Sequence, residues 1–202
     1  PWPLLRDLIE RGDVPEANRY HLHPTSDAVI DVALELIGTR FDFREEPIRM
    51  LEPSGGTGAI AMRLLQRYPG AHITIVEIDP LNCALMRAKG LDVIEADFLT
   101  WQADKPYDLI VMNPPFDNLA CLDHVLHAVK MMERHGMLLT VLPDMAKARA
   151  FTTAKAAQVM DLICTHGVTE ALPRGSFITA KAVATFWGQI NGLDNPRDRC
   201  DR

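Results

Sequence analysis

The sequence predicts an α/β fold in which seven strands form a doubly wound sheet, mostly parallel, with an antiparallel hairpin strand at its C-terminal end. Two observations support this prediction. From residue 48 onward, short apolar runs alternate with longer segments of helical spacing, which is typical of a parallel sheet covered by helices. The last two apolar runs have no strong helical segment between them, so we expect them to pair as an antiparallel hairpin.

The predicted elements follow one another in a regular order. Strands are expected at residues 48–52, 73–77, 92–95, 109–112, 137–142, 161–170 and 182–189. Helices are expected between them at residues 59–68, 81–89, 119–134 and 144–157. Pro80 in a first helical turn, and Gly90 and Gly136 just past helix ends, support these boundaries. Ahead of the sheet, residues 23–38 predict a helix that Thr25 or Ser26 caps.

Composition indicates one domain, and it argues against a generally basic nucleic-acid-binding protein and against a membrane-spanning protein. With 202 residues and 48% hydrophobic content, the chain suits one domain at residues 21–190, between an N-terminal arm or short helix (1–20) and a polar tail (191–202). A net charge of −6 excludes a general attraction to nucleic-acid phosphates, so such contact requires a local basic patch. No apolar run approaches the ~18 residues of a membrane span. The four cysteines have no CxxC spacing, which favours reduced thiols in a cytoplasmic protein.

A glycine-rich turn, "MLEPSGGTGAI", follows the first predicted strand. Glu52 and Pro53 end the strand, and Ser54, Gly56 and Gly58 lead into a helix. Glycines let the backbone approach a ligand closely, and the helix N-terminus supplies free amide donors. The missing Gly-Lys-Ser/Thr argues against a triphosphate, and Glu52 would repel a dinucleotide's pyrophosphate. An acid before this turn suits a cofactor with a cationic amino acid, although a tight turn without ligand has the same pattern.

Acidic residues also follow the next two predicted strands. Glu77 lies about 20 residues beyond the glycine turn, the position from which an acid reaches ribose hydroxyls in a doubly wound fold. Asp97, in "EADFL", can accept a hydrogen bond from an exocyclic amine, and Phe98 can flank a flat ring. Each acid alone could be a solvated strand end. Their order at consecutive strand ends nevertheless predicts a ligand site.

The fourth predicted strand ends in Asn113-Pro114-Pro115-Phe116. Two consecutive prolines remove two backbone donors and push Asn113 into an extended conformation, so the segment is a stiff turn. Together, "LEPSGGTGAI", "VEIDP", "EADFL" and "NPPF" resemble the class I S-adenosylmethionine-dependent methyltransferases, specifically the branch of the adenine-N6 type that methylates exocyclic amines or amides. The resemblance covers about residues 22–190 and implies a Rossmann-like fold with S-adenosyl-L-methionine as cofactor.

The resemblance also implies a role for individual residues. It assigns the cofactor to His23, Pro24, Thr25, Glu52, Pro53, Ser54, Gly56, Gly58, Glu77, Ile78, Asp97, Phe98 and Asn113. Within that set, Glu52 and the glycine turn hold the methionine part, Glu77 the ribose and Asp97 the adenine. In the catalytic turn, the Asn113 side-chain oxygen and the Pro114 carbonyl accept hydrogen bonds from the target amine, while Phe116 stacks on the base and Pro115 adds rigidity.

The favoured target is adenine N6 in DNA, with relaxed sequence specificity or a specificity subunit as partner. This expectation arises because related sequence-specific enzymes add a recognition domain, whereas only a short tail follows the last predicted strand. A ribosomal or transfer RNA base methyltransferase, a protein glutamine-N5 methyltransferase and an inactive cofactor-binding subunit remain alternatives. The turn at residues 172–177 resembles a loop that frames the target base. The candidate basic patch consists of Lys147, Arg149, Lys155, Arg174 and Lys181, although a solvated face explains these residues equally well.

No metal is expected. The pairs His21/His23 and His124/His127 have the spacing of metal ligands, but no matching set of acids or cysteines stands nearby.

Overall fold

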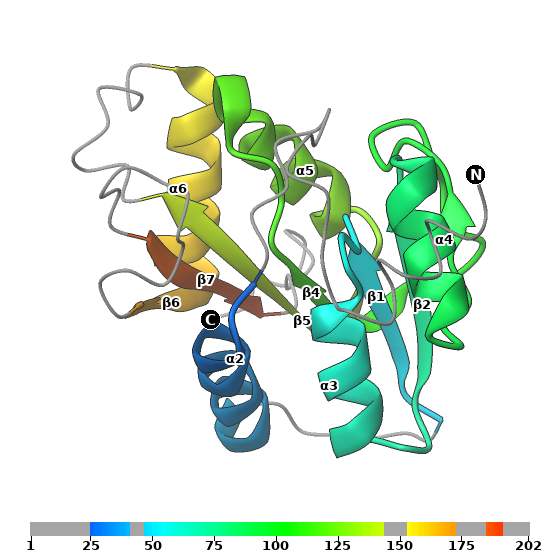
Figure 1. Ribbon diagram of the computed structural model, residues 1–202. Coiled ribbons are helices and arrows are strands. Elements are labelled where there is room, and N and C mark those ends of the chain that lie inside the picture. Colours follow the sequence, from blue (N-terminus) through cyan, green and yellow to red (C-terminus); the bar gives the residue numbers. More distant parts are fainter. Residues whose placement is uncertain (1–24, 41–46, 144–152, 173–184, 192–202) are drawn as a thin grey trace.

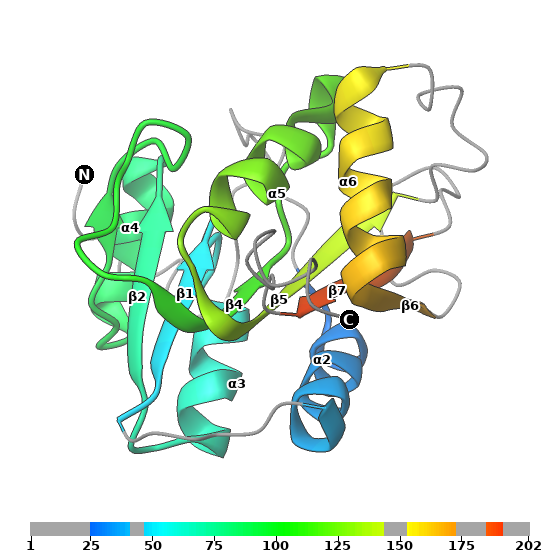
Figure 2. The same ribbon diagram turned by 180° about the vertical axis from the view of Figure 1, so that it is seen from behind.

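The computed structural model describes residues 25–40, 47–143, 153–172 and 185–191, the last of these by their backbone alone. These residues form a seven-stranded sheet with helices on both faces (Figures 1 and 2). Its strands are β1 (Arg49–Pro53), β2 (His72–Glu77), β3 (Ile94–Glu95), β4 (Tyr107–Met112), β5 (Met132–Pro143), β6 (Gly167–Ala171) and β7 (Thr185–Asn191). The order across the sheet is β3-β2-β1-β4-β5-β7-β6.

The strand directions confirm the predicted Rossmann-like architecture. Strands β3, β2, β1, β4 and β5 pair in parallel, and β7 runs antiparallel to both of its neighbours, β5 and β6. Leu51 of β1 lies opposite Thr74 of β2 on one side and Ile110 of β4 on the other. The chain therefore winds outward in two directions from the β1–β4 pair, which is where such folds bind ligands.

Among the described residues there are six helical segments, one ahead of β1 and the others between strands. They are α2 (Asp27–Arg40), α3 (Ala59–Arg67), α4 (Pro80–Ala88), the 3₁₀ turn η1 (Asp117–Leu119), α5 (Ala120–Val129) and α6 (Ala154–His166). Local capping sets several starts: Asp79 accepts a hydrogen bond from the Leu81 N–H ahead of α4, and Thr153 caps α6 in the same way. The carbonyl of Ser26, one of the two predicted caps, accepts the first hydrogen bonds of α2.

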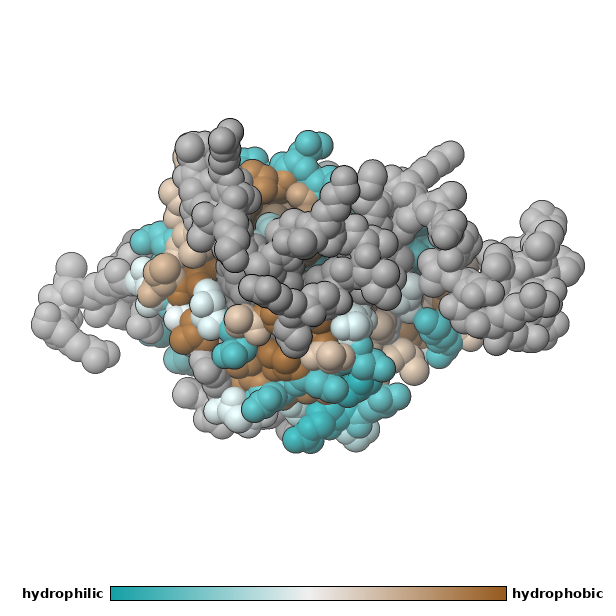
Figure 3. Space-filling model, turned by 60° about the vertical axis from the view of Figure 1, so that its left-hand side comes forward, coloured by the Kyte–Doolittle hydropathy of each residue, from teal (hydrophilic) through white to brown (hydrophobic). Residues whose placement is uncertain are grey.

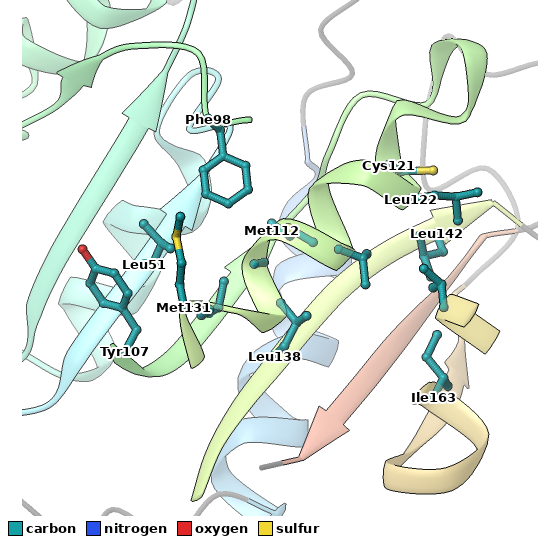
Figure 4. Packing of buried hydrophobic residues seen from close by; sticks show 14 of the residues in the cluster. Leu51, Phe98, Tyr107, Met112, Cys121, Leu122, Met131, Leu138, Leu142 and Ile163 are labelled. Atoms are coloured by element: carbon teal, nitrogen blue, oxygen red, sulfur yellow. The ribbon is translucent and has the colours of Figure 1, made fainter. Parts of the chain in front are cut away.

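Side chains of alternate strand residues pack against helices on opposite faces. In β4, Ile110 and Met112 join α5 and α6 in one core cluster, whereas Leu109 and Val111 join α2 and α3 in another. Figure 4 shows part of the first cluster, in which Phe98 points from its loop toward the interior. The strands are thus buried on both faces, which explains their continuous apolar runs.

The outer surface of α2 and α3 is polar. Arg63 of α3 pairs with Asp27, at 3.3 Å, and with Asp31, both on α2. Figure 3 shows hydrophilic surface along the bottom of the view, the height at which Figure 1 draws these two helices. This ion-pair network joins the two helices on their solvent side, opposite the apolar stripe that they bury.

Three predicted elements are corrected. Residues 161–166 form the end of α6 rather than a strand, because Ala156, Val159 and Ile163 recur at helical spacing and are all buried. Cys164, predicted to be strand-like, accordingly lies on this helix. The helix predicted to end at residue 134 ends at Val129, since β5 begins at Met132. The helix predicted at 144–157 is observed only from Ala154, and residues 144–152 lie outside the described part.

Several further expectations concern thiols, membranes and the chain ends. Cys83 and Cys121 are buried free thiols and Cys164 is an exposed one. Within the described ranges, no helix is both long and apolar enough to cross a membrane. The predicted arm, residues 192–202 of the predicted tail and the turn at 173–177 lie outside the described residues.

Candidate active site

The loops after β1, β2, β3 and β4 all leave the same edge of the sheet, because these strands are parallel. We call this the carboxyl edge, after the strand ends that form it. After β1 the chain enters α3 on one face, and after β4 it enters α5 on the other. The structure therefore gathers the predicted residues of the glycine turn, the two strand-end acids and the Asn-Pro-Pro-Phe turn at one edge.

The glycine turn is fixed by its backbone. The N–H groups of Ser54 and Gly55 both donate to the Val76 carbonyl, at 2.8 and 3.0 Å, which ties the turn to β2. A Cβ atom on Gly55 would overlap the Ile75 side chain, so a larger residue there would have to displace its neighbours. Ser54 has a φ of 88°, a left-handed conformation that non-glycine residues rarely adopt. Strain of this kind is concentrated in binding sites.

Glu52 carries a buried carboxylate beside this turn. Its side chain is 1% exposed, and its Oε2 atom has no hydrogen-bond partner among the described residues. Burial raises the pKa of Glu52 well above its ordinary value, and the nearby Glu77 charge adds to the rise, while the Ala61 backbone N–H opposes it. A buried acceptor without a cation suits a positively charged ligand group.

Glu77 is held by two backbone donors. Its Oε2 accepts from the Gly56 N–H at 2.6 Å, and its Oε1 accepts from the Asp79 N–H at 2.8 Å. Burial raises the pKa of Glu77, and these hydrogen bonds oppose the rise. The carboxylate thus bridges the glycine turn and the start of α4. Next to it, Ile78 is 40% exposed and gives the edge an apolar surface.

Asp97 is exposed in the loop after β3. Its Oδ1 accepts from the Leu99 N–H at 2.9 Å, and the Ala96 N–H before it donates to the Glu77 carbonyl. Phe98, by contrast, is only 3% exposed and lies in the core, and its contact with a flat ring stays a prediction. Leu99, which the sequence reasoning missed, is 37% exposed beside Asp97; its signal is an apolar residue in a solvated loop.

The Asn-Pro-Pro-Phe turn meets the N-terminal element. The Asn113 Nδ2 donates to the Thr25 Oγ1 at 3.0 Å, a contact between residues 88 positions apart. Pro114 is buried, and Phe116 is half-buried between the two core clusters. The structure therefore brings Thr25 to the Asn-Pro-Pro-Phe turn, while His23 and Pro24 lie outside the described residues.

The remaining candidates are the basic patch and the histidines considered as metal ligands. Lys155 pairs with Asp123 at 2.6 Å and so joins α6 to α5, whereas the rest of the candidate basic patch lies outside the described residues. His124 and His127 bond to backbone carbonyls. In the described part of the chain, no group of three or more His, Cys, Asp and Glu residues is arranged to hold a metal.

The carboxyl edge fits the predicted cofactor. Glu52 offers a buried acceptor to an ammonium group, and the glycine turn packs closely against the Ile75 and Met86 side chains beside it. Glu77 has an acceptor at a ribose position, and Ile78 and Leu99 offer apolar surface to a flat ring. Carboxylates suit the ammonium and sulfonium cations of S-adenosylmethionine, and backbone N–H groups suit its carboxylate.

Comparison with known families identifies the chain. The family model described as the methyltransferase small domain, MTS, matches residues 25–151. The chain belongs to the MTS methyltransferase family.

Two curated relatives are methyltransferases by name, and the name of the second gives an adenine of a tRNA as its target. The chain is 36% identical over 135 residues to the Type II methyltransferase M.CvrRI of Paramecium bursaria Chlorella virus XZ-6E, covering 56% of this chain and 33% of that protein. It is also 36% identical over 105 residues to a tRNA1(Val) (adenine(37)-N6)-methyltransferase of Bacteroides thetaiotaomicron, covering 46% and 42%. The chain thus spans less than half the length of these relatives.

Solved structures share the fold of the MTS chain. A Listeria monocytogenes protein assigned to the class I S-adenosylmethionine-dependent methyltransferases superposes with a TM-score of 0.70 at 17% identity, over 95% of this chain and 67% of that one. The N-methyltransferase NodS of Bradyrhizobium japonicum, in complex with S-adenosyl-l-homocysteine, gives a TM-score of 0.63 at 16% identity, over 94% and 99%.

Proposed function

We propose that the protein transfers a methyl group from S-adenosylmethionine to the exocyclic N6 amine of adenine in a nucleic acid, with DNA favoured over RNA. The observation that carries the proposal is the meeting of two features at the β1–β4 switch point. One is the buried Glu52 with its glycine turn, and the other is the turn that carries Asn113. The relative named as a tRNA1(Val) (adenine(37)-N6)-methyltransferase supports adenine N6 as the target atom.

The catalytic turn meets the chemical demand of this target. An adenine amine is a poor nucleophile because its lone pair is delocalised into the ring. The Asn113 side-chain oxygen and the Pro114 carbonyl accept its N–H hydrogens and hold the nitrogen in line with the methyl group. Phe116 stacks on the base, and the two prolines keep the acceptors rigid. S-adenosylmethionine, when bound, supplies an activated methyl group on sulfur. The amine loses its proton to solvent after transfer, so no general base is assigned.

The cofactor residues divide the ligand among three strand ends. Glu52 faces the ammonium group, Glu77 accepts from the ribose hydroxyls, and Asp97 accepts from the adenine amine. A cation beside Glu52 lowers the pKa of that carboxyl toward its ordinary value, so binding and ionisation of Glu52 are linked. Glu77 keeps its two backbone bonds and offers its remaining lone pairs to the ribose.

Recognition of nucleic acid needs more than the catalytic turn. A target adenine inside a duplex has to be flipped out of the stack to reach Asn113. The net charge of −6 gives no general attraction to phosphates, so we assign sequence recognition to a local basic patch or to a specificity subunit.

The test is transfer of tritiated methyl from S-adenosylmethionine to unmethylated duplex DNA, bulk RNA and a protein extract in parallel, followed by nucleoside digestion and mass analysis. The Asn113→Ala variant is the control for adventitious counts. N6-methyladenine from DNA, absent with the variant, is the expected result. The tRNA methyltransferase relative makes RNA the second candidate, and counts in RNA alone would replace DNA as substrate. Counts in protein alone would overturn the nucleic-acid proposal.

A further inference from the structure

Two histidines of α5 lie directly beneath the loop that carries Asp97. The ring of Phe98 is 4.9 Å from that of His127, in an edge-on arrangement, and 5.6 Å from that of His124. Phe98 is 3% exposed and His124 is 8% exposed, whereas His127 is half-buried, so the packed rings reach from the core to the surface at His127. Figure 4 shows the Phe98 side chain directed from its loop toward the hydrophobic core cluster.

Hydrogen bonds to backbone carbonyls show which nitrogen of each histidine ring carries a hydrogen. The His127 Nε2 lies 2.9 Å from the Trp101 carbonyl oxygen, and the His124 Nδ1 lies 2.9 Å from the Ala120 carbonyl oxygen. A carbonyl oxygen only accepts, so each of these nitrogens carries a hydrogen. Burial lowers the pKa of His124, although the Asp97 and Asp123 charges oppose the effect. His124 is therefore a neutral ring at neutral pH.

The Asp97 loop is anchored at both ends. At its start, the Ala96 N–H donates to the Glu77 carbonyl at 2.9 Å. At its end, the Trp101 N–H donates to the Asp97 carbonyl at 2.9 Å, and the Trp101 carbonyl in turn accepts from His127. His127 is thus the contact through which α5 sets the position of the turn at Asp97. Because α5 follows the Asn-Pro-Pro-Phe turn within a few residues, one helix supports both loops.

We propose that His127, with His124 packed beside it, is a positioning residue that places the Asp97 carboxylate for the adenine of the cofactor. The inference rests on the proposed function, in which Asp97 accepts from the adenine amine. Neither histidine touches the cofactor in this account. Their role is to hold the backbone of the loop, so their loss should affect the choice between purine rings more than the affinity for the rest of the cofactor.

Calorimetry with two ligands tests this role. S-adenosylhomocysteine carries the adenine amine, and S-inosylhomocysteine carries an oxygen in its place. A carboxylate that accepts from the amine should give the parent a preference of about tenfold or more for the first ligand. His127→Gln keeps an N–H donor near the place of Nε2 and should retain the preference. His127→Asn has its donor at the Nδ1 place, out of reach of the Trp101 carbonyl, and should lose most of it.

The Asp97→Ala variant tests the role of Asp97 separately from the positioning role of His127. It should lose the preference to the same extent as His127→Asn, with S-inosylhomocysteine affinity unchanged in both. If Asp97→Ala loses the preference and His127→Asn keeps it, the positioning role is overturned while the role of Asp97 stands. If Asp97→Ala keeps the preference, the role of Asp97 falls, and the inference with it. Equal weakening of both ligands in His127→Asn but not in His127→Gln would reduce His127 to a structural residue and also overturn the inference.

Discussion

Acidic residues stand at both edges of the sheet, but in opposite states. At the carboxyl edge, Glu52 and Glu77 are buried, and burial raises the pKa of each. At the amino edge, where β1 and β4 begin, the acids surround Arg49: its backbone N–H donates to Asp108 at 2.8 Å, and its guanidinium lies 3.4 Å from Asp104. The protein thus supplies partners to the acidic residues of the amino edge, whereas it leaves those of the carboxyl edge without a cation.

This difference shows which edge is built for a ligand. The amino edge is internally complete, since Arg49 also lies over the Tyr107 ring at 5.1 Å and donates to the Pro106 carbonyl. The carboxyl edge, in contrast, carries buried carboxylates, a left-handed Ser54 and an acceptor on Glu52 that no described residue satisfies. Features of that kind destabilise a fold and persist at sites where a ligand compensates for them.

Loss of the catalytic acceptor should have the largest effect. In Asn113→Ala the target amine loses one of its two acceptors, so we expect methyl transfer to fall by about 100-fold or more. Affinity for S-adenosylhomocysteine should stay close to the parent value, because the acids of the carboxyl edge are unchanged. Single-turnover kinetics and calorimetry measure the two quantities. A variant that folds but no longer binds the cofactor would refute the division of roles.

The Thr25 hydroxyl should have the next largest effect. Its acceptance of the Asn113 Nδ2 hydrogen turns the amide oxygen to the other side of the side chain. Without that contact the amide can flip, so Thr25→Val should lower kcat by about tenfold, the equivalent of one ordinary hydrogen bond.

The conservative variant and the cofactor affinity check this interpretation. Thr25→Ser keeps the hydroxyl and should restore kcat. The alternative is the sequence-derived role, in which Thr25 closes over the methionine carboxylate. A fall in cofactor affinity in Thr25→Val, with kcat unchanged at saturation, would favour that role instead.

Neutralising Glu52 should stabilise the protein. Glu52→Gln removes a buried charge, and we expect the free energy of unfolding at pH 7 to rise by about 1 kcal/mol. Because the folded-state pKa of Glu52 is raised above its unfolded value, its destabilising effect is present at high pH and fades as the pH falls toward the unfolded value. The gain should therefore shrink on acidification. Denaturant titrations at several pH values would reveal a constant gain, or none, if Glu52 were already satisfied.

A substitution at the amino edge should have the smallest effect. The Arg49–Asp104 pair is solvent-accessible, with Asp104 80% exposed, so Asp104→Asn should change the free energy of unfolding by no more than about 0.5 kcal/mol. Added salt should erase even this difference. A loss of several kcal/mol in thermal or denaturant unfolding would mean that this pair supports the fold far more than an exposed ion pair does.

Much of the fold and of the carboxyl edge could be predicted because the sequence patterns that specify them are local. A buried parallel strand needs a continuous apolar run, and a tight turn with left-handed residues needs glycine at positions such as Gly56 and Gly58. Each of these requirements is met by a few residues that are neighbours in the sequence. The mostly parallel sheet, the glycine turn and the helix that follows it were therefore accessible from the sequence alone.

The features that sequence reasoning missed depend on distant partners. Residues 161–166 are apolar enough for a strand, and only packing against α5 and the sheet decides for helix. Phe98 is predicted beside a ligand, but His124 and His127, from a different part of the chain, enclose it in the core. The Thr25–Asn113 bond joins residues 88 positions apart, and no local pattern specifies such a pair.

The comparison of the two edges is tested most directly by calorimetry of S-adenosylhomocysteine binding to the parent, Glu52→Gln and Asp104→Asn under one set of conditions. If the carboxyl edge holds its acids for the cofactor, Glu52→Gln should weaken binding by about tenfold or more, the usual effect of losing a hydrogen bond to a charged group. Asp104→Asn should bind as the parent does. Equal affinities for all three proteins would contradict the account.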